Sequence, residues 1–352
     1  MEISATNIEG ELGRLWDTQT GSTAIKACLF NLIVYTHEPR RTDYFQTIVR
    51  SIIEKFPCRI IFIQGNRDRS QDYLKVQVSA ETIGKGSSAV ACEQIVLQVA
   101  GKQYARVPYL ILPHFVPDLP IYLLWGQDPT KDNEILPHLQ AFASRLVFDS
   151  DCSEDLSQFS KALLRQMQTT KLALVDMNWT AISGWRDVLA KTFDSKERID
   201  QLSHCKEIKI VYNETSSDYL HHPDVPALYL QAWLAAQLEW KLLSREKSNG
   251  ATRLTYQNKD GMLNVTLSHQ NWNKLVPGAI LSVDITGKDN HFFSIIRSED
   301  SPQAFVHIST KDECGIPFSF QLPSSEKGKS LMNVLFFRSN NAHYTKMLGA
   351  LL

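Results

Sequence analysis

The chain has 352 residues, of which 43% are hydrophobic and 21% charged, a composition typical of a globular protein with one large domain or two ordinary ones. Its 37 basic residues nearly balance its 38 acidic residues, giving a formal net charge of −1. This balance argues against a protein that binds nucleic acid or anionic membranes, since proteins of both classes carry an excess of basic residues. We therefore expect no nucleic-acid partner and no membrane partner.

The start of the chain and its longest apolar stretch indicate where in the cell the protein is located. Met1–Gly10 is polar and acidic, which predicts that no secretory signal is present. Val107–Trp125 is long enough to suggest a transmembrane helix, but it contains four prolines together with His114 and Asp118, so we expect it to be buried in protein. The six cysteines lie at least 30 residues apart. We therefore predict a cytoplasmic protein with mostly inert thiols.

Strands and helices alternate over residues 1–170. Apolar spacing predicts an amphipathic helix over Arg41–Lys55 and a shorter helix that includes His138–Phe142. The predicted strands are Ala27–Tyr35, Cys58–Gln64, Leu74–Ser79, Glu93–Val99, Ile121–Trp125 and Arg145–Asp149. Strands interleaved with helices predict an α/β domain with a mixed or parallel sheet and flanking helices.

The pattern changes over residues 171–352. A strand at Leu172–Asp176 leads to a tryptophan-bearing helix that runs through Phe193, and a helix is predicted from Asp224 to about Leu243. The remaining strands are predicted at Ile208–Tyr212, Thr252–Gln257, Met262–Ser268, Ala279–Thr286, His291–Arg297, Ala304–Ser309 and Leu331–Arg338, and Ala342–Leu352 is predicted to be helical. We expect an α+β domain with a mainly antiparallel sheet, beginning within about ten residues of position 171.

No motif for catalysis stands out. Gly84–Ser88 resembles a fragment of a phosphate-binding loop, but it lacks the earlier glycine and the following Ser or Thr. No Gly-x-Gly-x-x-Gly follows the first strand, and no Gly-x-Ser-x-Gly is present. The densest metal-ligand candidate, His221-His222-x-Asp224, directly precedes a helix, where polar residues usually cap. We predict no catalytic residue, no metal and no cofactor.

Tryptophans and prolines form the remaining unusual features. Pro117 and Pro120 stiffen the segment before the strand that ends at Trp125. Trp125 either fills the edge of the core or serves as an aromatic anchor for a protein partner. Trp179 and Trp185 are six residues apart, so on one helix they point about 120° apart. We expect one of them to pack inward, while the other could face a partner or the boundary between the domains.

These residues resemble the motifs of the glucose-6-phosphate dehydrogenase assembly protein (OpcA) family. The resemblance runs in order along most of the chain, through Asn31–Val34, Phe56–Ile60, Cys92–Ile95, Leu112–Trp125, Arg145–Asp149, Asp176–Arg186 and Ala232–Leu234. Leu124, Ala181 and Gly184 depart from the family pattern.

The resemblance implies a non-catalytic cytoplasmic accessory protein that binds glucose-6-phosphate dehydrogenase and promotes its oligomeric assembly or activity. It makes ten residues candidates for the partner interface or for family motifs: Glu93, Asp118, Pro120, Trp125, Arg145, Asp149, Asp176, Trp179, Trp185 and Arg186. One alternative is a sugar-phosphate-binding enzyme or metabolite sensor of the same pathway that uses Lys85, Ser87 or Arg186. Another is thiol regulation through Cys92, although the adjacent Glu93 argues against a reactive thiolate.

Overall fold

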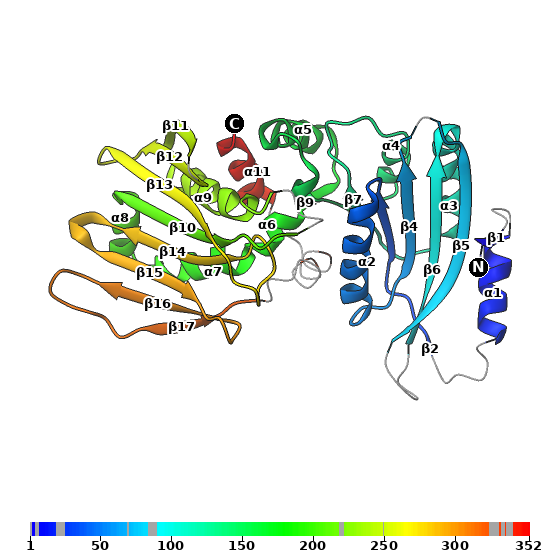
Figure 1. The fold of residues 1–352 in the computed structure, drawn as a ribbon, viewed down its shortest axis with the longest axis horizontal. Helices are drawn as coiled ribbons and strands as arrows, with labels where there is room; N and C mark the ends of the chain where they lie inside the picture. The colour runs from blue at the N-terminus through cyan, green and yellow to red at the C-terminus, as the bar shows by residue number, and fades with distance from the viewer. Residues whose placement is uncertain are drawn as a thin grey trace. The chain divides into compact units, whose positions relative to one another are not determined.

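The computed structural model describes residues 2–3, 7–18, 25–68, 70–83, 90–217, 222–248, 250–323, 331, 335 and 341–352. The chain divides into two compact units. The first comprises Met1–Asp176 with Leu335–Phe337, and the second comprises Met177–Val334 with Arg338–Leu352. Each unit is built around its own sheet (Figure 1).

The first unit contains a nine-stranded mixed sheet with the order β1-β5-β6-β4-β3-β7-β8-β9, in which β2 also pairs with β6. Its strands are β1 (Glu2–Ile3), β2 (Ile25–Lys26), β3 (Asn31–Thr36), β4 (Arg59–Asn66), β5 (Tyr73–Ile83), β6 (Val90–Ala100), β7 (Ile121–Gly126), β8 (Arg145–Phe148) and β9 (Ala173–Asp176). The run from β6 to β9 is parallel throughout, whereas β5 and β1 add antiparallel pairs at one edge.

The six parallel strands follow the doubly wound order in which the third, second and first strands along the chain are followed by the fourth, fifth and sixth. The strand order reverses between β3 and β7. The structure therefore confirms the predicted α/β class of the N-terminal half, and it adds a specific topology that the sequence pattern does not specify.

Helices of the first unit are α1 (Ile8–Thr18), α2 (Pro39–Ile53), α3 (Val107–Ile111), α4 (Leu136–Gln140) and α5 (Leu156–Thr169), with short 3₁₀ turns at Gly101–Arg106, Leu112–His114 and Ser150–Cys152. Pro39 lies in the first turn of α2, and Phe45, Ile48 and Ile52 recur at helical spacing and are buried. Helix α2 packs against β3, while α1 lies beside β5 at the edge of the sheet (Figure 1). At the start of α5, the Asp155 carboxylate accepts hydrogen bonds from the first backbone N–H groups.

The second unit contains an eight-stranded sheet with the order β11-β12-β13-β10-β14-β15-β16-β17. Its strands are β10 (Glu207–Asn213), β11 (Lys241–Ser248), β12 (Ala251–Gln257), β13 (Met262–Gln270), β14 (Ile280–Thr286), β15 (Phe292–Arg297), β16 (Gln303–Ser309) and β17 (Phe318–Gln321). Among these described strands the pair β10–β13 is parallel and the other pairs are antiparallel. This confirms the predicted α+β half with a mainly antiparallel sheet.

Helices of the second unit are α6 (Met177–Ala181), α7 (Ser183–Thr192), α8 (Lys196–Ser203), α9 (Val225–Leu238) and α11 (Asn341–Ala350), with a 3₁₀ turn at Lys288–Asn290. Helix α9 packs on β10 and β13, and both α6 and α11 pack on α9 (Figure 1). Inward residues such as Leu254, Val265 and Val283 are buried, and they alternate along their strands with more exposed residues. This alternation is typical of a sheet with one covered face.

Two predicted elements after residue 220 differ from the structure. The helix expected to reach Leu243 ends at Leu238, because Glu239 has a left-handed backbone (φ 57°), and the exposed strand β11 follows. Most of the strand predicted at Leu331–Arg338 lies outside the described residues, but Leu331 and Leu335 are helical and both are buried. Apolar residues four positions apart fit one face of a helix as well as they fit a strand, so the strand prediction is wrong at these two positions.

Candidate functional site

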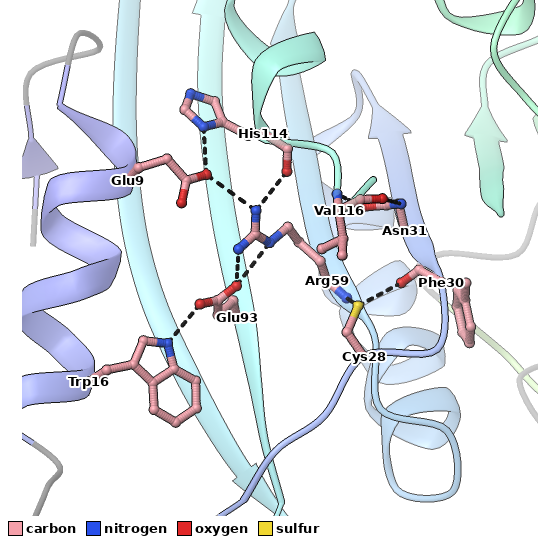
Figure 2. Close-up of polar contacts among 9 residues, drawn as sticks. All are labelled: Glu9, Trp16, Cys28, Phe30, Asn31, Arg59, Glu93, His114 and Val116. Atoms are coloured by element: carbon pink, nitrogen blue, oxygen red, sulfur yellow. Dashed lines mark hydrogen bonds and ion pairs between the residues drawn. The ribbon is translucent and has the colours of Figure 1, made fainter. Parts of the chain in front are cut away.

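A polar cluster of the first unit is centred on Arg59, the first residue of β4. The Arg59 guanidinium makes two hydrogen bonds with the Glu93 carboxylate of β6, one of them from Nε at 2.9 Å, and both side chains are buried (Figure 2). Nη1 of Arg59 also donates to the His114 carbonyl at 2.8 Å and to Glu9 of α1 at 3.2 Å. Trp16, also on α1, donates its indole N–H to Glu93 at 2.7 Å. The cluster therefore connects α1 to two neighbouring strands of the sheet.

A cavity of about 320 Å³ lies beside this cluster. Its lining includes Arg59, Glu93 and the thiol-bearing residues Cys28 and Cys58. Cys28 accepts a hydrogen bond from the backbone N–H of Arg59 and donates to the carbonyl of Phe30, as Figure 2 shows. Burial raises the pKa of both thiols, so they remain protonated at neutral pH.

The cluster lies where β3, β4 and β7 begin. Next to it, the side chain of Asn31, the first residue of β3, exchanges two hydrogen bonds with the backbone of Val116, which precedes β7 (Figure 2). Doubly wound folds bind their ligands at the opposite, carboxyl ends of the strands. The positive charge of Arg59 is balanced by Glu93 and Glu9, so this arrangement holds elements together rather than presenting a charge to a ligand.

Two more predicted residues form buried contacts at the other end of the strands. Asp149, directly after β8, forms an ion pair with Arg41 of α2, and both side chains are completely buried. Asp176, the last residue of β9, accepts hydrogen bonds from the backbone N–H and the hydroxyl of Ser150 at 2.7 and 3.0 Å. Both carboxylates thereby fix the ends of neighbouring strands, a role that the sequence does not distinguish from a surface contact.

Trp125 lies in the core of the first unit. It is 1% exposed, and its ring stacks on Tyr35 of the neighbouring strand β3 with the ring centroids 4.3 Å apart. The sequence leaves open whether Trp125 fills the core or anchors a protein partner, and the structure supports the first interpretation.

The remaining candidates of the first unit lie near β7 and β8. Asp118 is exposed and has a left-handed backbone (φ 61°). The Pro120 carbonyl accepts a hydrogen bond from the N–H of Asn31, which joins the predicted stiff segment to β3. Arg145 begins β8, and partial burial lowers the pKa of its guanidinium. Among these residues, Asp118 offers a charged group directly to solvent.

The three candidates at Trp179, Trp185 and Arg186 lie within the second unit. The guanidinium carbon of Arg186 lies 3.4 Å from the centroid of the Trp179 ring, and Nη1 of Arg186 donates to the Trp179 carbonyl at 3.0 Å. Burial lowers the pKa of Arg186 to about 9. Trp179 is 5% exposed and Trp185 is 2% exposed, so both rings pack inward, contrary to the expectation that one could face a partner. They do so because they belong to separate short helices, α6 and α7, rather than to one continuous helix.

The other sequence features have simple outcomes. The loop-like segment Gly84–Ser88 and His221 lie outside the described residues. Oδ2 of Asp224 lies 3.9 Å from Nζ of Lys247. Among the described residues, no three His, Cys, Asp or Glu side chains form a group that could hold a metal ion. Burial is the largest cause of the raised pKa of Cys92, ahead of the charge on Glu93. Within the described part of the chain, no helix has the length and apolar character needed to span a membrane.

The fold is similar to that of solved oxidoreductases. The 3-ketoreductase KijD10 from Actinomadura kijaniata, solved in complex with TDP-benzene and NADP, has a TM-score of 0.52 and 10% identity, covering 91% of this chain and 94% of that chain. An oxidoreductase from Sinorhizobium meliloti has a TM-score of 0.50 and 9% identity, covering 92% of this chain and 95% of that chain. At this level of identity, the similarity concerns the fold alone.

The residues of this chain do not fit a dinucleotide at the usual position. Such folds bind the pyrophosphate on a glycine-rich turn between the first strand and its helix. Here the turn from β3 to α2 is Thr36-His37-Glu38-Pro39, which has no glycine and includes a proline without an N–H. The N–H groups of Arg41 and Thr42 donate to the Glu38 carbonyl at 3.1 and 3.2 Å, and the Glu38 carboxylate would repel a phosphate.

Sequence comparison gives a more specific relationship. Residues 49–167 match the family described as the glucose-6-phosphate dehydrogenase subunit N-terminal domain, and residues 172–345 match the C-terminal domain of the same subunit. Two curated OpcA proteins, named for the OxPP cycle, are 28% identical over 219 residues (Nostoc punctiforme) and 26% identical over 208 residues (Synechocystis sp.). These matches cover 60% and 56% of this chain, but 45% and 40% of the relatives, so the matched region is less than half of their length. The ordered motifs and the two domain matches agree, and the chain belongs to the glucose-6-phosphate dehydrogenase assembly protein (OpcA) family.

Proposed function

We propose that this protein is a non-catalytic cytoplasmic accessory protein that binds glucose-6-phosphate dehydrogenase and promotes its oligomeric assembly or activation in the oxidative pentose phosphate pathway. The observation that carries the proposal is the match of both halves, in order, to the two domains of a glucose-6-phosphate dehydrogenase subunit. An accessory subunit of this kind needs a stable surface rather than reactive groups.

The contacts of the family-motif residues support the same function. Glu93, Asp149 and Asp176 are held in buried internal contacts, so their charges stabilise the fold and do not form a catalytic constellation. The turn from β3 to α2 lacks the glycines that a dinucleotide requires.

Activation by an accessory protein requires differential binding. The protein can shift the dehydrogenase toward its active assembly only to the extent that it binds that assembly more tightly. A preference of about 100-fold corresponds to about 2.7 kcal/mol. This free energy is well within the range of an ordinary protein interface.

Sugar-phosphate binding by the chain alone receives less support. Of the residues considered for it, Arg186 is held by the ring and the carbonyl of Trp179. Lys85 and Ser87 lie outside the described residues.

The decisive experiment mixes the purified chain with the dehydrogenase from the same organism. We expect a complex of greater mass than either protein by light scattering, together with faster turnover of glucose 6-phosphate at subsaturating substrate. Separate proteins at micromolar concentration with an unchanged rate would overturn the proposal, and so would turnover by the chain alone. In a calorimetric control without the dehydrogenase, glucose 6-phosphate should release no saturable heat; saturable heat would favour the sensor.

A further inference from the structure

Arg297, the last residue of β15, is a buried cation without an acidic partner in the described part of the chain. Its side chain lies on the helix-covered face of the sheet, and the residue is 7% exposed. Nε donates to the Ile280 carbonyl at 3.0 Å, and the guanidinium carbon lies 5.8 Å from the centroid of the Trp185 ring. Burial alone lowers the pKa of Arg297 to about 10, with no contribution from a carboxylate.

This arrangement differs from that of the other buried arginines. Arg41 and Arg59 each contact a buried carboxylate, Asp149 and Glu93 respectively. A buried charge is costly unless it is paired and hydrogen-bonded. Nη1 and Nη2 of Arg297 have no acceptor among the described residues and are not fully buried, so no carboxylate of the described chain balances the charge at this position.

A small cavity adjoins this guanidinium. It has a volume of about 20 Å³, and its walls include Arg297, Trp185 of α7, Pro226 of α9 and the segment Val276–Ile280. The indole N–H of Trp185, in the same wall, is buried and also has no acceptor among the described residues. Two hydrogen-bond donors therefore lie beside one cavity, and the described residues of its lining include no carboxylate.

We propose that this cavity is a binding site for a compact monovalent anion, a halide such as chloride, held by the guanidinium of Arg297 beside the indole of Trp185. Such a ligand only accepts hydrogen bonds and supplies the negative charge that the described residues do not. A cavity of about 20 Å³ has room for about one water molecule, which selects chloride-sized ligands and excludes bulky anions. The site is independent of the proposed function, because it would stabilise the second unit whether or not the dehydrogenase is bound.

The first test is thermal unfolding of the full chain at constant ionic strength, with sodium gluconate replaced stepwise by sodium chloride or sodium acetate. A ligand that binds only the folded state multiplies the ratio of folded to unfolded protein by 1 + [L]/Kd. Chloride at ten times its Kd should therefore raise this ratio about tenfold. We expect the melting temperature to rise by about 3 °C or more, since tenfold corresponds to about 1.4 kcal/mol. Acetate, which is larger than the cavity, should behave like gluconate, and equal melting temperatures in chloride and gluconate would overturn the proposal.

Two variants test whether the stabilisation by chloride comes from this cavity. Arg297→Gln should lose the dependence on chloride, whereas Arg253→Gln, which removes an exposed arginine from β12 of the same sheet, should retain it. A chloride effect that persists in folded Arg297→Gln, or that disappears in Arg253→Gln, would contradict the assignment.

A second measurement uses the unaltered chain and does not depend on the folding of a variant. A crystal soaked in sodium bromide should give an anomalous peak within about 3.5 Å of the terminal nitrogens of Arg297, at hydrogen-bond distance for a halide. Bromide at exposed lysines with none at Arg297 would overturn the proposal.

Discussion

At the scale of single residues, the Arg59–Glu93 pair gives the clearest prediction. Glu93→Ala removes the carboxylate that two Arg59 nitrogens contact and leaves a mostly buried guanidinium with Glu9 as its remaining acidic partner. We expect a loss of about 3–5 kcal/mol in the free energy of unfolding, measured by urea denaturation. Lys131→Ala, which breaks an exposed pair with Glu154, is the control and should have no measurable effect. Equal effects of the two substitutions would show that Arg59 is not buried in solution.

Trp125 separates a core role from a partner role. Trp125→Ala removes a ring that is stacked on Tyr35 and 1% exposed, so we expect a loss of about 3–5 kcal/mol in unfolding free energy. Any loss of dehydrogenase stimulation should accompany this lower stability. Asp118→Asn, at an exposed position with a left-handed backbone, should keep the stability unchanged. Stimulation lost by a Trp125→Ala protein that melts like the parent would instead identify an interface residue.

His37 predicts how stability depends on pH. It follows β3 in the turn to α2, and burial lowers the pKa of its imidazole from the ordinary value of 6.5. The unfolded chain therefore binds a proton at a higher pH than the folded chain, so stability should fall as the pH decreases through about 6.5. Urea denaturation between pH 8 and pH 5 should show a smaller decline for His37→Gln than for the parent. The same decline in both proteins would exclude His37 as the cause.

At the scale of elements, the sequence predicts what depends on local pattern. The spacing of Phe45, Ile48 and Ile52 predicts α2, and period-two runs predict most strands of the second sheet. The strand order is set by long-range pairing, which a local pattern does not encode. For the same reason, the motif segments that contain Arg59 and Glu93 can be recognised in the sequence, but the pairing of these two residues across 34 positions cannot.

Helix α7 carries a glycine where a side chain has no room. A Cβ added to Gly184 would lie 2.2 Å from Cδ of Pro323, closer than real Cβ contacts. Glycine to alanine within a helix normally adds about 1 kcal/mol of stability, but here we expect Gly184→Ala to reduce it by about 1–3 kcal/mol. In α1, Gly13 has no atom within 4 Å of the added Cβ, so Gly13→Ala should be stabilising. The opposite signs, read from melting temperatures, test the packing of α7; a stabilising Gly184→Ala would refute it.

At the scale of the whole molecule, the chain combines a fold similar to that of oxidoreductases with family relationships to a dehydrogenase subunit. The parallel strands β6, β4, β3, β7, β8 and β9 keep the doubly wound order. One architecture can carry different functions, because function depends on the site rather than on the architecture. The turn from β3 to α2 is where this chain differs from a dinucleotide-binding protein.

This difference predicts that the chain does not bind NAD⁺ or NADP⁺. Phosphates need free backbone N–H groups at the start of the first helix, whereas here Pro39 has none and the N–H groups of Arg41 and Thr42 are already bonded to Glu38. Calorimetric titration of either dinucleotide, up to about 1 mM, the upper end of ordinary KM values, should give no saturable heat. The dehydrogenase titrated with NADP⁺ under the same conditions is the positive control. Saturable binding of a dinucleotide by the chain alone would mean that the site has another geometry, and it would reopen an oxidoreductase activity for this protein.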